Sequence, residues 1–311
     1  MYSYLDLVKQ TDSVPYPKDV QHNFIQQKCY AFLAHDGIPI GRILPFVVEH
    51  LTGFPSVLKV DHNKQTVKIS PSMDTVHARS EMLSRIVNEW RRKKTFKVLE
   101  GWRDELYCVY NPTHTEYLFI ERAAAALFGV ITYGVHIVGY VPGPELKLWI
   151  PRRSYNKPTF PGLLDNTVAG GIGYPHGIME TVVKECAEEA GLSREYVLSH
   201  IKPAGVISYN HQRENTVELE EGLFQPEVEY VYDLEMEPDV IPKVVDGEVE
   251  SFELFTIDRV KEELKKGSFK YNTATITIDF FIRHGILTPE DEPDYLEIVQ
   301  RSHRLLEYPV M

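Results

Sequence analysis

Three glutamates with helical spacing are the residues of this sequence best placed to do chemistry. Glu185, Glu188 and Glu189 stand at positions i, i+3 and i+4, so a helix through this segment places the three carboxylates on one face. Like charges four residues apart destabilise a helix by about 0.2–0.5 kcal/mol per pair, and a bound cation offsets this repulsion. Because Mg²⁺ prefers carboxylate oxygens and keeps positions open for water and phosphate, the spacing predicts a metal site.

The flanking residues predict the elements that position these carboxylates. Gly170 and Gly171 follow the apolar strand residue Val168, and the helix after this glycine-rich loop is expected to end at Gly191. The opposite face of the helix is apolar, which suits packing against a sheet, and it is formed by Val182, Val183, Cys186 and Ala190. The order of strand, glycine-rich loop and helix therefore places the glutamates beside the glycine pair.

The segment resembles the Nudix box, a motif written G-x5-E-x7-R-E-x-x-E-E-x-G and followed by an aliphatic residue. The resemblance is carried by Gly170-Gly171, Lys184-Glu185, Glu188-Glu189 and Gly191-Leu192. In that family the helical glutamates hold Mg²⁺ or Mn²⁺, and water cleaves a diphosphate bond. The resemblance therefore implies that the metal ligands are Glu185, Glu188 and Glu189, together with a backbone carbonyl of Gly170 or Gly171.

The same resemblance implies further roles and shows two departures from the motif. Lys184 stands where the motif has arginine, which keeps the charge but loses the planar fork, and it can reach Glu188 at i+4. Either Glu188 or Glu189 is expected to accept the proton of the attacking water. His176 stands where the motif has its first glutamate, with Glu180 as the nearest upstream acid, and we count His176 among the substrate contacts.

A longer stretch is similar to one group within that family, the thiamine pyrophosphokinase-related Nudix proteins of fungi and plants. The likeness is strongest over residues 146–264, and the matching segments are residues 164–171, 175–178, 183–186 and 188–191. The resemblance implies a hydrolase and not a kinase. Its small-molecule substrates would be the diphosphates of thiamine and of damaged analogues, such as oxythiamine and oxothiamine diphosphate, which it converts to monophosphate plus phosphate.

The implied fold is of the α/β (α+β) class, a Nudix α/β/α sandwich with a mixed sheet. We assign residues 129–311 to this domain and its C-terminal helices, and residues 1–128 to an N-terminal α+β domain that covers the site and helps to select the substrate. Hydrophobic and turn patterns predict helices over residues 42–51, 73–92, 257–266, 273–284 and 293–305, and a strand pair interrupted at Pro226.

Other residues near the motif could complete the site. Arg152 and Arg153 end a predicted strand, where they could hold phosphate oxygens or form a solvated basic edge. Glu248, with Glu250 behind it, is the candidate for a further metal-binding carboxylate, although acidic turns are common. Cation–π stacking on a thiazolium ring, worth about 0.5–2 kcal/mol, is open to four aromatic residues that could equally be core: Trp149, Tyr155, Phe160 and Tyr209.

Composition and charge exclude several classes of protein. The chain has 311 residues, with the hydrophobic (43%) and charged (25%) content of an ordinary globular protein. A formal net charge of −12 argues against nucleic-acid binding. Cys29, Cys108 and Cys186 lack metal-ligand spacing and suit a reducing compartment. Because we find no membrane span and no targeting segment, we expect a cytoplasmic protein, with an organellar form left open.

Three alternative functions fit the same residues. A hydrolase of nucleotide diphosphates, such as sugar or dinucleotide diphosphates, uses the same motif, and a non-hydrolytic diphosphate-binding protein can retain it. Allylic diphosphate isomerases share the fold but need a cysteine and a glutamate that act on carbon, and no cysteine–histidine–proline motif follows Asp165. Phosphate release separates the hydrolases from the other two classes. The sequence leaves the number of metal ions and the oligomeric state open.

Overall fold

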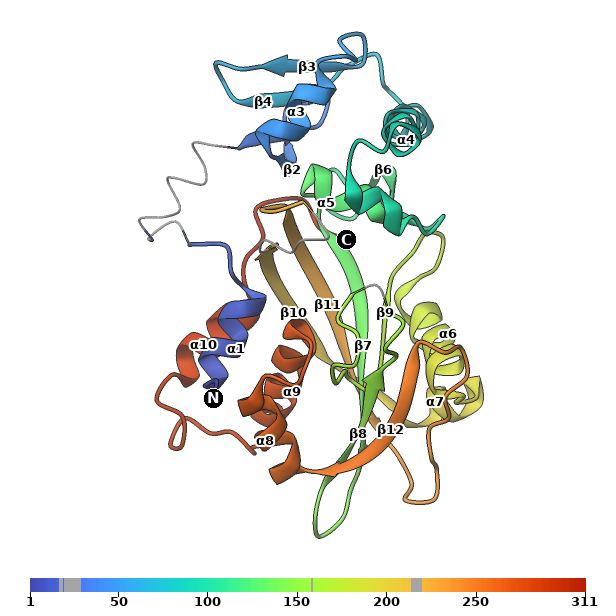
Figure 1. Ribbon diagram of the computed structural model, residues 1–311, viewed down its shortest axis with the longest axis vertical. Helices are drawn as coiled ribbons and strands as arrows, with labels where there is room; N and C mark the ends of the chain where they lie inside the picture. Colours follow the sequence, from blue (N-terminus) through green and yellow to red (C-terminus); the bar gives the residue numbers. More distant parts are fainter. Residues whose placement is uncertain (17–18, 20–28, 158, 214–219) are drawn as a thin grey trace.

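The computed structural model describes residues 1–16, 19, 29–157, 159–213 and 220–311. Within these residues the strands form three sheets, and the largest of them, with six strands, belongs to the second half of the chain (Figure 1). None of the helices in the described ranges has the length and apolar character needed to cross a bilayer. The chain is a mixed α+β protein, which confirms the predicted fold class.

The six-stranded sheet is mixed. Its order is β10-β11-β7-β8-β12, with β9 paired to β7. Strands β7 and β11 run parallel, whereas the other neighbours are antiparallel. The bounds are β7 Thr132–Val141, β8 Lys147–Arg153, β9 Val168–Gly171, β10 Ile201–Gln212, β11 Phe224–Glu235 and β12 Val249–Thr256. The central strand β7 thus contacts both the strand that carries the glycine pair and the long strand β11.

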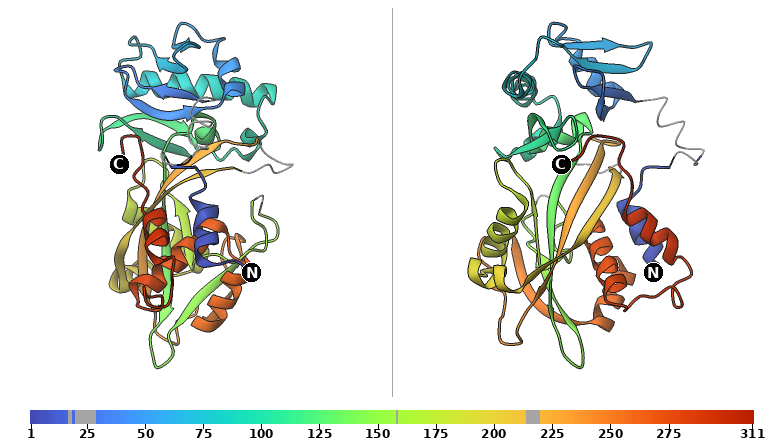
Figure 2. Two further views of the ribbon diagram at one scale, coloured as in Figure 1. Left: turned by 90° about the vertical axis from the view of Figure 1, so that its left-hand side faces the viewer. Right: turned by 180° about the vertical axis from the view of Figure 1, so that it is seen from behind.

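Helices cover both faces of this sheet, which gives the expected α/β/α sandwich (Figures 1 and 2). One face carries α6 (Ile178–Ala190) and α7 (Arg194–His200). The other face carries α1 (Tyr4–Thr11), α8 (Ile257–Lys266), α9 (Tyr271–Arg283) and α10 (Tyr295–Ser302). Side chains alternate along β7: Val135 and Ile137 enter the core beneath α6, whereas Val138 enters the core beneath α9. The sheet therefore separates two apolar cores.

The first half of the chain contains two smaller sheets. One has the order β2-β1-β4-β3, and the other is the hairpin of β5 and β6. The bounds are β1 Tyr30–Leu33, β2 Pro39–Ile43, α3 Pro45–Leu51, β3 Leu58–Asp61, β4 Thr66–Ile69, α4 Val76–Lys93, β5 Leu106–Tyr110, β6 Glu116–Glu121 and α5 Ala125–Phe128, with 3-10 turns at Lys97–Gly101 and Arg122–Ala124. Buried side chains of these elements form a third apolar cluster.

A close approach of two backbones brings β2 against the end of α5. A Cβ at Gly41 would overlap the carbonyl oxygen of Phe128, and a Cβ at Gly129 would overlap that of Arg42. Gly129 also has a φ of +55°, a conformation that favours glycine. The division of the chain after residue 128 stays a proposal. Helix α1 belongs to the first half by its position in the sequence, but it packs against α9 and α10 and lies apart from the rest of that half (Figure 1).

The helix expected over residues 42–51 is only partly right. Residues Pro39–Ile43 form β2, in which Ile40 and Ile43 are buried, and α3 begins afterwards at Pro45. Proline is favoured in the first turn of a helix, where its missing N–H has no intrahelical partner. The chain therefore passes from strand β2 to helix α3 within two residues. The turn residues that precede β2 hide this boundary in the sequence.

The interruption expected at Pro226 is wrong, because β11 runs through this residue without a break. Pro226 lies opposite Asn210 of β10, and the ladder of β11 with β7 begins one residue later, where Glu227 lies opposite Thr132. Proline is tolerated where a strand is paired on one side only. The other predicted helices are confirmed as α4, α8, α9 and α10.

His211 connects three elements on the face of the sheet that carries α9. It lies in β10, its ring stacks on Tyr271 of α9 with centroids 4.3 Å apart, and its Nδ1 is 3.0 Å from the carbonyl oxygen of Gln10 in α1. Burial lowers the pKa of His211 to about 4, and the charge of Arg213 adds to this effect. The fold therefore favours the neutral imidazole.

We expect acid to destabilise the protein partly through His211. The unfolded chain protonates this histidine near pH 6.5, whereas the folded chain does so only near pH 4. Its contribution to stability is therefore complete above the higher pKa and is lost as the pH falls toward the lower one. Between about pH 7.5 and about pH 5, urea denaturation should show a loss about 2 kcal/mol larger in the wild type than in His211→Gln. Equal losses in the two proteins would contradict this assignment.

Candidate active site

Helix α6 is fixed at both ends by its own residues. At the N-terminus the backbone N–H of Gly177 donates to Glu180 Oε2 at 3.0 Å. At the C-terminus Gly191 has a φ of +64°, and its N–H donates to the carbonyl oxygen of Ala187 at 3.2 Å. The face toward the sheet is buried as predicted, through Val182, Val183, Cys186 and Ala190. The helix and its end at Gly191 are thus confirmed, and Glu180 serves as its cap.

The three glutamates of α6 differ in their surroundings. Glu189 is partly buried, and its Oε2 accepts a hydrogen bond from the N–H of Ala169 in β9 at 3.1 Å. Glu185 has 15% of its side chain exposed and lies against Gly170, where any Cβ would overlap its carboxyl group. Glu188 is 51% exposed. The helix therefore presents two carboxylates to β9 and one to solvent.

Lys184 lies between two of these glutamates. Its Nζ is 3.0 Å from Glu185 Oε1 and 2.9 Å from Glu188 Oε2. Burial disfavours the ammonium ion, but the hydrogen bonds to Glu188 and Glu185 prevail and raise the pKa of Lys184. The predicted contact with Glu188 is therefore present, and it is shared with Glu185.

The surroundings of Glu185 and Glu189 disfavour their negatively charged forms. Burial raises the pKa of Glu185, and it raises that of Glu189 strongly. Neighbouring carboxylates add to both effects: Glu188 acts on Glu185, whereas Asp165 and Glu248 act on Glu189. This excess of acidic groups is the electrostatic condition that a bound cation relieves.

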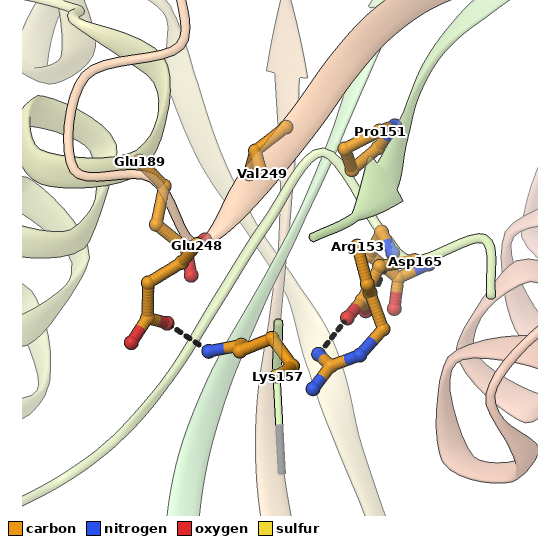
Figure 3. Close-up of a pocket in the computed structure, with 8 residues that line it drawn as sticks. Pro151, Arg153, Lys157, Asp165, Glu189, Glu248 and Val249 are labelled. Carbon is orange, nitrogen blue, oxygen red and sulfur yellow. Dashed lines mark hydrogen bonds and ion pairs between the residues drawn. The ribbon is translucent and has the colours of Figure 1, made fainter. Parts of the chain in front are cut away.

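A cavity of about 10 Å³, room for one water molecule, lies in front of Glu189 (Figure 3). Two ion pairs border it. One joins Lys157 to Glu248, and the other joins Arg153 to Asp165, with 2.7 Å between Nη1 and Oδ2. The remaining lining comes from Pro151, Asn166 and Val249. Because a diphosphate is far larger than this cavity, a substrate of that kind must lie over its mouth.

Of the two later carboxylates suggested by the sequence, Glu248 is the one at this cavity. Burial opposes its ionisation, but Lys157, Arg103 and Arg122 together lower the pKa of Glu248. Glu250 is exposed on β12 and does not line the cavity. Glu248 lies next to Glu189, on the side of the site away from Arg153 and Asp165 (Figure 3).

The two arginines predicted to hold phosphate both donate hydrogen bonds to the loop after β8. Arg152 donates from Nη1 to the carbonyl oxygen of Gly162 at 2.8 Å. Arg153 donates from Nε to the carbonyl oxygen of Phe160 at 3.0 Å and from Nη2 to that of Thr159 at 2.9 Å. Arg153 still lines the cavity, whereas Arg152 does not. Both guanidinium groups thus have protein partners that hold this loop.

His176 and the four aromatic candidates are dispersed. His176 is exposed in the loop before α6 and does not line the cavity. Trp149 and Tyr209 are buried, so neither presents a ring to solvent. Tyr155 and Phe160, which are 64% and 37% exposed, lie in the loop that carries the cavity residue Lys157. Two of the four aromatic rings are therefore accessible, and that of Phe160 also packs against Tyr271 of α9.

A chain of polar side chains that we did not predict runs from the cavity into the core. Asn166 Oδ1 is 2.8 Å from His136 Nδ1, and His136 Nε2 is 3.7 Å from Glu229 Oε1. Tyr209 donates to Glu229 at 3.0 Å and also to Glu227. Acidic residues at alternate positions of an otherwise apolar strand were the sequence signal for this cluster.

The donor set suits a hard divalent cation. Glu185, Glu189 and Glu248 supply carboxylate oxygens, and Gly170 supplies a carbonyl oxygen on the neighbouring strand; such oxygens are the ligands that Mg²⁺ prefers. Within the described residues, no three acidic, histidine or cysteine side chains lie close enough together to hold one metal ion. In this arrangement Lys184 holds Glu185, so metal binding requires that carboxylate to exchange the lysine for the cation.

Two protein-family models match successive parts of the chain. Residues 6–132 match a family described as a domain of unknown function (DUF4743), and residues 132–274 match the NUDIX domain. The second match contains β7, the glycine pair, α6 and Glu248. The first match ends where the six-stranded sheet begins.

Named relatives extend the match. Nudix hydrolase 24, chloroplastic, of Arabidopsis thaliana is 35% identical over 280 residues, covering 84% of this chain and 73% of that protein. Nudix hydrolase 20, chloroplastic, of the same plant is 43% identical over 209 residues, covering 66% of this chain and 53% of its own length. An uncharacterized protein of Saccharomyces cerevisiae is 38% identical over 322 residues, covering 100% of this chain and 93% of that protein.

The contact between Gly171 and Tyr107 gives a test of how the site is assembled. A Cβ at Gly171 would overlap the Tyr107 hydroxyl group, which makes no hydrogen bond within the described residues. Gly171→Ala should therefore lower the free energy of unfolding by about 1–3 kcal/mol. Adding Tyr107→Phe removes the overlapping oxygen and should restore at least about 0.5 kcal/mol of this loss.

Chemical denaturation of the two single variants and the double variant measures this coupling. Gly101→Ala is the control, because a Cβ at Gly101 meets nothing within 4 Å. Additive effects of the Gly171 and Tyr107 changes would show that the two residues do not touch.

Proposed function

Because the chain belongs to the Nudix hydrolase family, whose members cleave diphosphate bonds with divalent metal ions, we propose that it hydrolyses thiamine diphosphate and damaged analogues such as oxythiamine and oxothiamine diphosphate. The products are the monophosphate and phosphate. Mg²⁺ is the proposed metal, with Mn²⁺ as a substitute. The proposed metal ligands are Glu185, Glu188, Glu189, Glu248 and the glycine-pair carbonyl.

The observation that carries the proposal is the convergence of Glu185 and Glu189 on the glycine pair, with Glu248 beside Glu189 at the cavity. Oxygen donors from β9, from α6 and from the residue before β12 thus lie along one edge of the sheet, and a bound ion would draw them together. When bound, the metal lowers the pKa of a coordinated water and stabilises charge on the leaving phosphate. The protein's contribution is mainly to position these groups and to neutralise charge.

The residues of α6 have distinct proposed tasks. Glu189 is oriented by the N–H of Ala169, which fixes its carboxylate toward the cavity. Lys184 orients both Glu185 and Glu188. Of the two proton acceptors considered, Glu188 is reached directly from solvent, whereas Glu189 is partly buried. A positioned acid–base group of this kind contributes about 10²–10⁴-fold to the rate.

Accessible aromatic rings support a cationic aromatic substrate. Tyr155 and Phe160 lie on either side of Lys157 in the loop after β8, and both rings are exposed. A thiazolium ring can stack on such a face, with a contribution of about 0.5–2 kcal/mol, while the diphosphate extends toward Glu189. The resemblance of residues 164–171 and 175–178 to the thiamine-related group is the second support. Arg153 and His176 remain proposed contacts to substrate, and Arg152 acts through the loop that it holds.

The proposal extends to partners and location. The partner is a small-molecule diphosphate, and neither nucleic acid nor membrane has a part in the reaction. We propose a cytoplasmic location; the names of the two Arabidopsis relatives place those proteins in chloroplasts. Fractionation of cells that express the tagged chain distinguishes a cytoplasmic protein from an organellar one.

Substitution of the α6 carboxylates tests the chemistry. Glu189→Gln and Glu188→Gln keep the shape of the side chain and remove its charge, so each should lower Mg²⁺-dependent phosphate release at least about 10²-fold. Thermal unfolding should change little. Glu195→Gln, at an exposed position of α7, is the matched control and should keep full activity. Unchanged turnover in both site variants would remove this helix from the mechanism.

A panel of substrates tests the specificity. Thiamine, oxythiamine, nucleotide-sugar and dinucleotide diphosphates are compared by phosphate or monophosphate release, each with Mg²⁺ and with a chelator. We expect kcat/KM for the two thiamine compounds to exceed that for the nucleotides at least about tenfold, a difference of about 1.4 kcal/mol, and the chelator to abolish every activity. Preference for a nucleotide would overturn the thiamine assignment and leave the hydrolase assignment intact.

A further inference from the structure

The hairpin of β5 and β6 is joined to the loop that precedes α6. The N–H of Tyr174 donates to the carbonyl oxygen of Leu106 in β5 at 2.7 Å. The ring of Phe119 in β6 packs on that of Tyr174 with centroids 4.0 Å apart. Figure 1 shows this loop rising from α6 toward β6. The first half of the chain therefore contacts the glycine-rich segment directly.

Two glycines of this segment leave room for side chains of the hairpin region. The hydroxyl group of Tyr107 fills the space that a Cβ at Gly171 would need. A Cβ at Gly173 would lie 2.6 Å from Oε1 of Glu105. On the residue of β9 before Gly171, the Glu185 carboxyl group fills the corresponding space at Gly170. Side chains from both halves of the chain thus contact the same short glycine-rich segment.

Arg122 brings a positive charge to the same place. Its Nη1 is 2.8 Å from Oε2 of Glu105, its guanidinium group lies over the Tyr107 ring at 5.7 Å, and 41% of its side chain is exposed. Arg122 is therefore accessible from solvent and lies beside Glu105 and Tyr107, the two residues that contact the glycine segment.

Two of the other cations around the site, Lys184 and Arg153, have more partners than Arg122, whereas Lys157, like Arg122, has one carboxylate partner within the described residues. Lys184 contacts two carboxylates, Lys157 is paired with Glu248, and Arg153 has three partners in its own loop and at Asp165. Arg122 has one side-chain partner, Glu105, within the described residues. A guanidinium group offers a planar fork that matches two phosphate oxygens, which a lysine does not.

We propose that Arg122, positioned by Glu105 and Tyr107, binds a phosphate group of the substrate, so that the domain of unknown function completes the diphosphate site. The inference rests on the proposed hydrolysis of a diphosphate. The ring of Tyr107 lies beneath the guanidinium group and holds it beside the glycine segment. Glu105 holds Arg122 in place before substrate arrives and gives way to the phosphate oxygens afterwards.

The test compares Arg122→Gln, Arg122→Lys and Glu105→Gln with the wild type. We measure KM and kcat for thiamine diphosphate, and separately the Kd of methylenediphosphonate, a diphosphate that water does not cleave, in the presence of Mg²⁺. Arg122→Gln should raise both KM and Kd at least about tenfold, and Arg122→Lys should give a smaller increase. Glu105→Gln should raise the Kd less than Arg122→Gln does, because the Tyr107 ring still holds the guanidinium group when Glu105 no longer does; an equal or larger increase would contradict direct binding by Arg122.

Arg85→Gln is the matched control, because Arg85 is an exposed arginine of α4 with a single carboxylate partner, Glu81, at 2.6 Å. Thermal unfolding of each variant separates loss of folding from loss of binding. If the wild type is active and Arg122→Gln keeps KM and Kd within about twofold, the inference is overturned and the proposed function stands. If the wild type binds the probe through Arg122 but hydrolyses no diphosphate, the inference stands and the proposed function fails. If it neither binds nor hydrolyses, both fail.

Discussion

The site depends on the glycine pair at the end of β9, because side chains from two other elements occupy the space beside these glycines. Gly170 and Gly171 end β9, and the groups that replace their missing side chains come from opposite directions: the Glu185 carboxyl group from α6 and the Tyr107 hydroxyl group from β5. A Cβ at either position would push one of these groups away from the backbone. The glycine pair thus serves packing as much as turn geometry, and it brings carboxylates against a carbonyl-bearing strand.

The carboxylates around β9 differ in whether a neighbouring cation neutralises them. Glu248 and Asp165 each have a cation from the loop after β8, and Glu185 and Glu188 share Lys184. Among the described residues Glu189 has one hydrogen-bond partner, the N–H of Ala169, and burial raises its pKa strongly. Ion pairs therefore neutralise the border of the site but not its centre. A buried carboxyl group with acidic neighbours is what a divalent cation is suited to stabilise.

The two halves of the chain share apolar packing beside the site, because Cys108 and Tyr110 of β5 belong to the cluster beneath α6. The N–H of Tyr174 donates to the carbonyl oxygen of Leu106 in β5, and the ring of Phe119 in β6 packs on that of Tyr174. Both strands of the hairpin are thus joined to the glycine loop. This arrangement gives the first half a defined position beside the carboxylates, which a flexibly linked domain would lack.

The sequence by itself determined the local structure that carries the chemistry: the i, i+3, i+4 glutamates, the glycine pair, the apolar face of α6 and its end at Gly191 all follow from short-range spacing. The mixed sandwich follows from the resemblance of this motif to a known family. Only the tertiary structure decided which distant residues join them. Arg152 and Arg153 bind their own loop, Glu248 and not Glu250 reaches the cavity, and Glu105, Tyr107 and Arg122 arrive from the first half. Spacing along a chain encodes neighbours within one helix or strand, whereas contacts across the molecule depend on how whole elements pack, which no single residue reveals.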